Sequence, residues 1–220
     1  MKLICLNSGS NANCYFLKNK NGEILILDAG SSINKIMCNE EFTSFQKVVA
    51  VLVTHCHKDH SLEVEKYIEA GLNVCGYMNL EPLKKYKFGS FEVIPFLAKH
   101  DVKNFGFIIN NNFVYATDFV SIPKINGIKN WLIECNYNQA EWDKALMGNN
   151  PNYQLLGRIS KNHCSLEWLL NYFSTLEKPE QIILCHLSVS GNADKYEMIN
   201  QMSKFTNLVS IATKNKIWEI

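Results

Sequence analysis

The sequence predicts an α/β (α+β) protein in which two β-sheets pack together and helices cover their outer faces. Three observations lead to this fold class: short β-type runs dominate the first half, helical patterns fall between the later strands, and no repeat or Pro/Gly-rich linker interrupts the chain. Sheets and helices each bury an apolar face, so such a mixture forms stacked layers. We therefore expect one domain over residues 1–220.

The predicted strands are short runs of apolar, β-branched and aromatic residues bounded by turn residues. The turn Asn19-Lys20-Asn21-Gly22 joins the second and third runs and predicts a hairpin. The strands are expected at Lys2–Leu6, Cys14–Lys18, Ile24–Asp28, Val48–Thr54, Glu92–Phe96, Phe105–Ile109, Phe113–Thr117, Trp131–Glu134, Gln181–His186 and near Lys216–Ile220.

The predicted helices are bounded by residues that favour helix ends. Leu62–Ala70 follows a capping Ser61 and stops at Gly71. The others are Ala140–Met147 before Gly148, Leu166–Leu176 after Ser165, and Ala193–Phe205 after Asn192.

Composition and charge exclude several classes of protein. The formal net charge is +1 over 220 residues, which gives no global attraction to nucleic acid or membrane. No stretch approaches the ~18–20 apolar residues that span a bilayer, and the apolar run at Met1–Leu6 is too short for a signal peptide. The eight cysteines form no C-x-x-C pair and sit mostly in apolar runs, as reduced thiols do. We expect a cytoplasmic location.

The histidines carry the functional argument. The chain has six, and His55-Cys56-His57-Lys58-Asp59-His60 directly follows the apolar run Val48–Thr54. His55 and His57 are two residues apart, so an extended chain points both imidazoles to one side. Asp59 and His60 come where the chain turns into a helix and can face a second cation. The pattern predicts a site for two divalent metals, which can clamp a water and a phosphoryl or carbonyl group.

The His-x-His-x-Asp-His motif after a strand resembles the signature of the metallo-β-lactamase superfamily, whose fold is a four-layered αββα sandwich. Later residues fit the same resemblance: Asp28 in Leu27-Asp28-Ala29-Gly30, Asp118 after Thr117, and His186 in Cys185-His186-Leu187-Ser188. The resemblance implies that Asp28 orients the histidine loop without binding metal. It implies two metal sites that share Asp118, the first with His55, His57 and His100 and the second with Asp59, His60 and His186.

The surroundings of His100 indicate a branch of this superfamily. The stretch His100–Phe107 resembles the His…Phe/Tyr-Gly-Tyr pattern of ribonuclease Z and of small bacterial and phage exonuclease-like relatives. Ser8-Gly9-Ser10 and Glu134-Cys135-Asn136 are similar to elements of the same relatives. In that branch His163, before Cys164-Ser165, would protonate the leaving group, with Glu134 orienting or tuning it. The chain has no room for the arm that grips transfer RNA in ribonuclease Z.

The resemblance implies a metal-dependent hydrolase that cleaves phosphodiester bonds of DNA or RNA with a water activated by two metals. Asp59 would orient that water as well as bind metal. A phage-type phosphodiesterase acting on cyclic nucleotides is the alternative, and a non-catalytic metal-binding module is the alternative of another class. We expect Zn²⁺, with Mn²⁺ or iron suiting the same geometry, and the resemblance also implies a homodimer. The candidate substrate contacts are Lys58, Lys99, Lys103, Arg158 and Tyr137, the last standing where relatives often carry a histidine.

Overall fold

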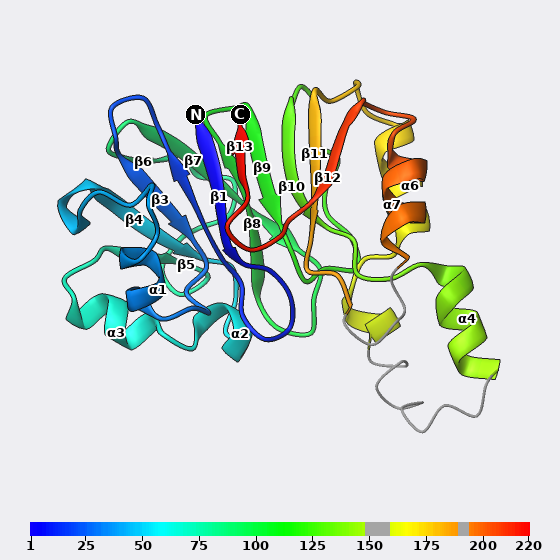
Figure 1. The fold of residues 1–220 in the computed structure, drawn as a ribbon, viewed down its shortest axis with the longest axis horizontal. Coiled ribbons are helices and arrows are strands. Elements are labelled where there is room, and N and C mark those ends of the chain that lie inside the picture. Colours follow the sequence, from blue (N-terminus) through cyan, green and yellow to red (C-terminus); the bar gives the residue numbers. More distant parts are fainter. Residues whose placement is uncertain (148–158, 189–193) are drawn as a thin grey trace.

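Two β-sheets lie face to face in the computed structural model, which describes residues 1–147, 159–188 and 194–220 (Figure 1). Within these residues the first sheet has six strands, in the order β13 (Ile217–Glu219), β1 (Lys2–Asn7), β2 (Cys14–Lys18), β3 (Ile24–Leu27), β4 (Val48–Val53) and β5 (Val74–Gly76). The second has seven, in the order β12 (Leu208–Ile211), β11 (Gln181–Cys185), β10 (Asn130–Glu134), β9 (Phe113–Ala116), β8 (Asn104–Ile109), β7 (Phe91–Ala98) and β6 (Tyr86–Phe88).

Helices cover the outer face of each sheet. Helices α1 (Ile33–Met37) and α3 (Val64–Glu69) pack on the first sheet through Ile36, Val64 and Tyr67. Helices α6 (Leu166–Ser174) and α7 (Lys195–Met202) pack on the second. Further helical elements are α2 (Lys58–Ser61), α4 (Gln139–Met147), the 3₁₀ turn η1 (Phe45–Lys47) and a helical stretch at residues 159–162. The predicted four-layered αββα sandwich is confirmed.

Strand β3 shows why so many strands are apolar on both faces. Its four residues are fully buried. Leu25 and Leu27 contribute to the core between the two sheets, whereas Ile24 and Ile26 contribute to the core under α1 and α3. Successive side chains of a strand point to opposite faces, so a strand covered on both sides needs an apolar residue at every position.

The direction of the strands brings several strand ends to one edge of the sandwich. Strands β3, β4 and β5 pair in parallel, as do β9, β10, β11 and β12. Strand β7 pairs antiparallel with β8, which pairs antiparallel with β9, so β7 also runs in the direction of β9. The loops that leave β3, β4, β7, β9 and β11 carry the predicted metal ligands and Asp28.

The predicted strands are confirmed with shifts of one or two residues at their ends. The prediction omitted α1, β5, β6 and β12, which are only three to five residues long. It was wrong about the first long helix: Ser61 ends α2 and its hydroxyl donates to the carbonyls of Cys56 and His57, and α3 starts at Val64. Ser165 does cap α6, accepting from the amide of Trp168.

Helix α7 is shorter than the predicted Ala193–Phe205. It begins after Asp194, whose side chain accepts from the amides of Tyr196 and Glu197 and so caps the helix. The predicted cap Asn192 and the predicted stop Gly148 lie outside the described residues.

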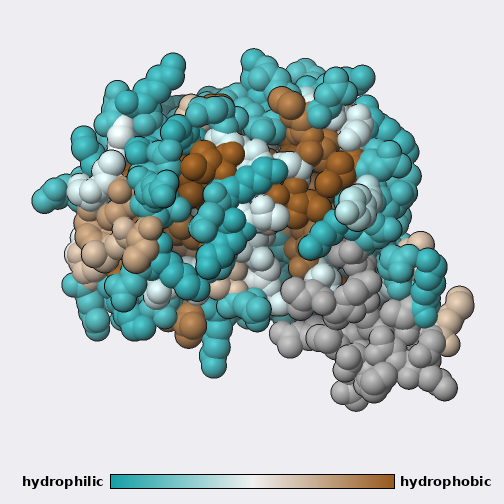
Figure 2. Space-filling model, in the orientation of Figure 1, coloured by the Kyte–Doolittle hydropathy of each residue, from teal (hydrophilic) through white to brown (hydrophobic). Residues whose placement is uncertain are grey.

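The face seen in Figure 2 is mostly hydrophilic, with an apolar area over β12. This strand forms one edge of the second sheet, and its residues Val209 and Ile211 are only half-buried. Among the described residues, no helix combines the length and the hydropathy needed to cross a bilayer.

Candidate metal centre

The candidate ligands come from loops at the shared edge of the two sheets. Three of the residues concerned adopt left-handed backbone conformations: Asp28, Asp118 and His186 have φ of 61°, 52° and 51°. Asp28 and His186 directly follow β3 and β11, and Asp118 comes two residues after the end of β9. Such values are uncommon outside glycine and concentrate at functional sites. The turn at each strand end directs the side chain back over the edge.

The first group consists of His55, His57, His100 and Asp118. His57 Nδ1 lies 3.1 Å from His55 Nε2 and 3.2 Å from His100 Nε2. His55 Nε2 lies 3.6 Å from Asp118 Oδ2. One nitrogen or oxygen from each of the four lies within 4.8 Å of the others, which is the spread expected of ligands around one cation.

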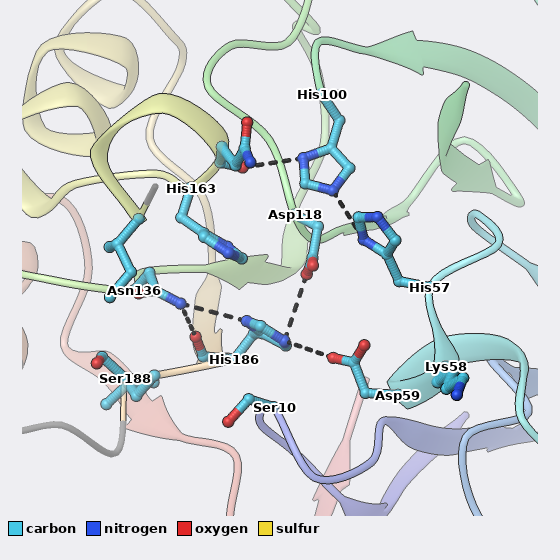
Figure 3. A pocket seen from close by; sticks show the side chains of 13 residues that line it. Ser10, His57, Lys58, Asp59, His100, Asp118, Asn136, His163, His186 and Ser188 are labelled. Atoms are coloured by element: carbon cyan, nitrogen blue, oxygen red, sulfur yellow. Dashed lines mark hydrogen bonds and ion pairs between the residues drawn. The ribbon is translucent and has the colours of Figure 1, made fainter. Parts of the chain in front are cut away.

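The second group consists of Asp59, His60, Asp118 and His186, again with ligand atoms within 4.8 Å of one another. His60 Nε2 lies 3.1 Å from Asp59 Oδ2 and 3.3 Å from Asp118 Oδ1. His186 Nε2 lies 3.2 Å from Asp59 Oδ2 and 3.4 Å from Asp118 Oδ1. Asp118 therefore offers one oxygen to each group. Figure 3 shows the Asp118 and Asp59 carboxylates on the same nitrogen of His186.

The outer nitrogens of the five histidines test whether this cluster fits metal ions. A histidine that binds a metal through one ring nitrogen normally donates from the other to an oxygen. All five follow this rule, with the oxygen within 3.5 Å. The pairs are His55 Nδ1 with Thr54 Oγ1, His57 Nε2 with Asp101 Oδ1, His60 Nδ1 with Asp28 Oδ2, His100 Nδ1 with the Asn162 carbonyl, and His186 Nδ1 with Glu134 Oε1.

Among these outer groups, Asp28 takes part in several hydrogen bonds at once. It is fully buried and accepts from the amide of Thr54 at 2.8 Å, the hydroxyl of Thr54 at 2.9 Å and the hydroxyl of Tyr115 at 2.6 Å. Its Oδ2 lies 2.6 Å from His60 Nδ1. These contacts hold the His60 ring with Nε2 toward Asp59 and Asp118.

The electrostatics of the cluster favour positive charge. Burial opposes protonation of His186, but the carboxylates of Asp118, Asp59 and Glu134 raise the pKa of His186 to about 10. Burial also opposes ionisation of Asp59, yet hydrogen bonds from His186 and His60 lower its pKa. Burial lowers the pKa of His55 to about 2, so this imidazole is neutral and free to bind a metal. The carboxylates that raise the pKa of His186 would equally favour a divalent cation beside that ring.

Comparison with solved structures shows the same fold over nearly the full chain. The metallo-β-lactamase fold protein YhfI from Bacillus subtilis matches with a TM-score of 0.72 and 16% identity, covering 99% of each chain. The chain has the metallo-β-lactamase fold. A diphosphatase of the PhnP family matches at 0.63 and 13% identity, covering 100% of this chain and 97% of that one. The short form of human tRNase Z matches at 0.65 and 13% identity, covering 100% and 99%.

No protein-family model and no curated protein matches the chain. The metallo-β-lactamase fold is therefore recognised here through its three-dimensional structure. One fold hosts many reactions, so the chemistry has to be argued from the site.

Two further residues extend the cluster of this metallo-β-lactamase fold. His163 Nδ1 lies 2.7 Å from Glu134 Oε1, and the other carboxylate oxygen of Glu134 accepts from the amides of Phe119 and Cys164. Glu134 is fully buried, and the ring of His163 stacks on that of His186 at 5.4 Å. Burial lowers the pKa of His163, but the Glu134 carboxylate outweighs it and raises that pKa. Glu134 thus contacts both His163 and the candidate ligand His186.

A cavity of about 430 Å³ opens over the cluster. His57, Asp59, His100, Asp118 and His186 line it together with His163 (Figure 3). Its remaining lining comes from Ser10, Lys58, Asn136, Ile159, Asn162, Leu187 and Ser188. The size suits a ligand as large as a mononucleotide.

The predicted substrate contacts lie in different places relative to the cavity. Lys58 lines the cavity, whereas Lys99 and Lys103 line an adjoining hollow of about 440 Å³ that shares His100. Tyr137 is 5% exposed and packs near Trp142, and it does not line the cavity. Arg158 lies outside the described residues.

Sequence reasoning assigned no role to several residues that support the cluster. Asp101 and Thr54 adjoin predicted ligands, and their ability to accept from a histidine nitrogen was a usable signal. Asn13, whose Nδ2 lies 3.0 Å from His60 Nε2 and 3.3 Å from Asp59 Oδ2, comes from a distant loop. Asn13 ends the stretch Ser8–Asn13, which resembles the Ser-Gly-Ser-x-Gly-Asn start of the exonuclease-like relatives, but that resemblance gave it no contact.

Proposed function

We propose that the protein is a metal-dependent hydrolase that cleaves phosphodiester bonds, with DNA or RNA strands as substrates. The observation that carries the proposal is the Glu134–His163 pair beside the two ligand groups. We assign no metal to His163: it is held by a buried carboxylate at the wall of the cavity, where it can give a proton to a leaving oxygen. The likeness to a diphosphatase and to tRNase Z agrees with this choice of bond.

The proposed ligands are His55, His57, His100 and Asp118 for one cation, and Asp59, His60, His186 and Asp118 for the other. Zn²⁺ is the proposed metal and Mn²⁺ the alternative, since a set of imidazoles and carboxylates accepts both. Two such cations would supply Lewis acidity at the phosphoryl oxygens and would lower the pKa of a bound water.

The side chains of the chain have separate tasks in this proposal. Asp59 binds metal through Oδ2 and orients the attacking water. His163 donates a hydrogen bond from Nδ1 to Glu134. The proton that it gives to the departing oxygen is therefore the one on Nε2. The raised pKa of His163 keeps that proton in place at neutral pH. Lys58, at the rim of the cavity, contacts a phosphate oxygen.

The second candidate substrate is a cyclic nucleotide, and the cavity volume of about 430 Å³ favours it. A mononucleotide fits inside such a volume, whereas a strand must also run along the surface. The chemistry at phosphorus is the same for both substrates, so the same side chains keep their proposed tasks.

The test is an assay of the purified protein on single-stranded DNA, a model RNA and 3′,5′-cyclic purine and pyrimidine nucleotides, with metal content measured on the same sample. Asp118→Ala should abolish turnover, and Glu180→Gln, on a surface carboxylate paired with Lys129, should not change it. Cleavage of a carboxylic ester or lactam alone would contradict the phosphodiesterase. Metal uptake with no turnover of any substrate would instead support the alternative that the protein is a non-catalytic metal-binding module.

A further inference from the structure

The two ligands Asp118 and His186 sit on backbone that is unfavourable for their residue types. Their φ values of 52° and 51° lie in the left-handed region, which an L-residue with a side chain rarely occupies. Such a conformation persists only where surrounding contacts hold it. The hydrogen bonds to the carbonyl groups of these turns therefore decide where the ligand atoms lie.

Asn104 holds the first turn. It is the first residue of β8 and is 1% exposed. Its Nδ2 donates to the carbonyl of Asp118 at 2.6 Å and to that of Thr117 at 2.9 Å. Both hydrogens of the amide are used, and both bonds end on the turn that presents the carboxylate shared by the two ligand groups.

Asn136 holds the second turn in the same way. It lies two residues beyond the end of β10 and is 4% exposed. Its Nδ2 donates to the carbonyl of His186 at 2.8 Å, while the amide of His186 donates to Ser8 Oγ at 3.1 Å. The two peptide groups that flank the His186 Cα are thus both fixed by side chains from other loops.

Both asparagines bury an unpaired oxygen to make these bonds. Among the described residues, the buried side-chain atoms without a hydrogen-bond partner are Asn104 Oδ1, Asn136 Oδ1 and Glu63 Oε2. An unpaired buried amide oxygen destabilises a protein, and an apolar residue of similar size would avoid that cost. The shared feature of the two asparagines is the amide nitrogen, which donates to a left-handed turn that carries a ligand.

We propose that Asn104 and Asn136 are positioning residues that set the metal affinity of the cluster by locking the turns of Asp118 and His186. The inference rests on the proposed metal centre. It also predicts different effects at the two positions: of the two ligand groups proposed above, Asp118 belongs to both and His186 to the second. Loss of the Asn104 amide should weaken the binding of both metals, and loss of the Asn136 amide should weaken the binding of one.

The experiment is a Zn²⁺ competition titration against a chromophoric chelator, supported by the visible absorption of the Co²⁺-loaded protein, which reports ligand geometry. For Asn136→Ala we expect one metal bound as in the wild type and one bound about 10–100-fold more weakly, the usual effect of removing a group that orients a ligand. For Asn104→Ala we expect a loss of similar size at both metals and an altered Co²⁺ spectrum.

Asn138→Ala is the matched control. Asn138 is also a buried asparagine, 4% exposed, but its Oδ1 accepts from the amide of Asp194 at the start of α7. This variant should lose thermal stability and keep wild-type metal affinity. If Asn104→Ala does not fold, Asn104→Ser, which keeps a shorter donor, takes its place with the same readouts.

Wild-type affinity for both metals in folded Asn104 and Asn136 variants would overturn the proposal and leave the two asparagines with a purely structural role. Equal weakening of both metals by Asn136→Ala would overturn the division between the two turns. Failure of the wild-type protein to bind Zn²⁺ or Co²⁺ would instead reject the metal centre itself, so the two failures are distinguishable.

Discussion

Asp28 illustrates how a single residue acts on the cluster without belonging to it. Its two oxygens take hydrogen bonds from Thr54 and Tyr115 and lie against His60 Nδ1, all at full burial. The sequence predicted this task because an aspartate after an apolar strand in the Asp-Ala-Gly context resembles a known motif. It could not predict Tyr115, which comes from the other sheet.

Asp28→Asn should weaken metal binding about 10–100-fold, because one oxygen is replaced by a donor that cannot accept from His60 or Tyr115. The measurement is the metal dissociation constant of the folded variant. Tyr115→Phe removes only one of the bonds and serves as the comparison, with a smaller loss. Equal affinity in Asp28→Asn and the wild type would show that the His60 ring is fixed by other contacts.

His163→Ala should slow hydrolysis about 10²–10⁴-fold when the leaving group is an alkoxide, the usual contribution of a general acid. It should have little effect on a nitrophenyl phosphodiester, because that leaving group departs without a proton. The measurement is kcat for the two substrate types with metal content held equal. A similar loss on both types would assign His163 to substrate binding or to the support of His186, on which it stacks.

At the scale of elements, strands were easier to predict than helices. The runs at β3 and β4 are apolar at nearly every position because both faces are covered, and that pattern is visible in the sequence. Strands β5 and β6 have three residues each, too few to show any period. The predicted start of the helix after the histidine cluster was wrong because Ser61 looks like a cap in sequence, whereas its hydroxyl closes the preceding turn.

The pairing of β7 with β8 depends on a glycine. Phe96 lies opposite Gly106, and a Cβ built on Gly106 would be 2.1 Å from the Cζ atom of the Phe96 ring. The glycine in Phe105-Gly106-Phe107, which the sequence offered only as part of a family pattern, therefore makes room for an aromatic ring in the core over the second sheet.

Gly106→Ala should destabilise the fold by about 1–3 kcal/mol, because the ring has to move within a packed core. Denaturant unfolding measures the change. Gly106→Ala should cost less stability in a Phe96→Leu background than in the wild type, since the smaller side chain leaves space for the methyl group. Absence of any coupling between the two substitutions would contradict this account.

At the scale of the whole molecule, the sequence named the candidate ligands but few of the residues that contact them. The spacing within His55–His60 pointed to metal on its own, and the resemblance added His100, Asp118 and His186, which the structure brings to the same cavity. Asn104 gave no usable signal, because an asparagine at a strand end normally indicates a turn. Asn136 entered only as part of the Glu134-Cys135-Asn136 element, with no role of its own. The expected homodimer stays a prediction.

Removal of metal should lower the melting temperature of the protein. A ligand present at about 100 times its dissociation constant stabilises the folded state by about 2.7 kcal/mol, and about 2–4 °C accompanies each kcal/mol in a chain of this size. We therefore expect a fall of about 5–10 °C in a chelating buffer, reversed by added Zn²⁺. An unchanged melting temperature, with loss of the metal verified by elemental analysis, would speak against a metal held by both sheets.

The cluster draws its side chains from both sheets, with residues between 55 and 186 in the chain. During synthesis on the ribosome, the Val48–Val53 strand with its histidine loop emerges long before β11. A partly synthesised chain therefore has an incomplete set of ligands and should bind a cation only weakly. The proposed metal centre can therefore form only late in synthesis, after β11 has joined the second sheet.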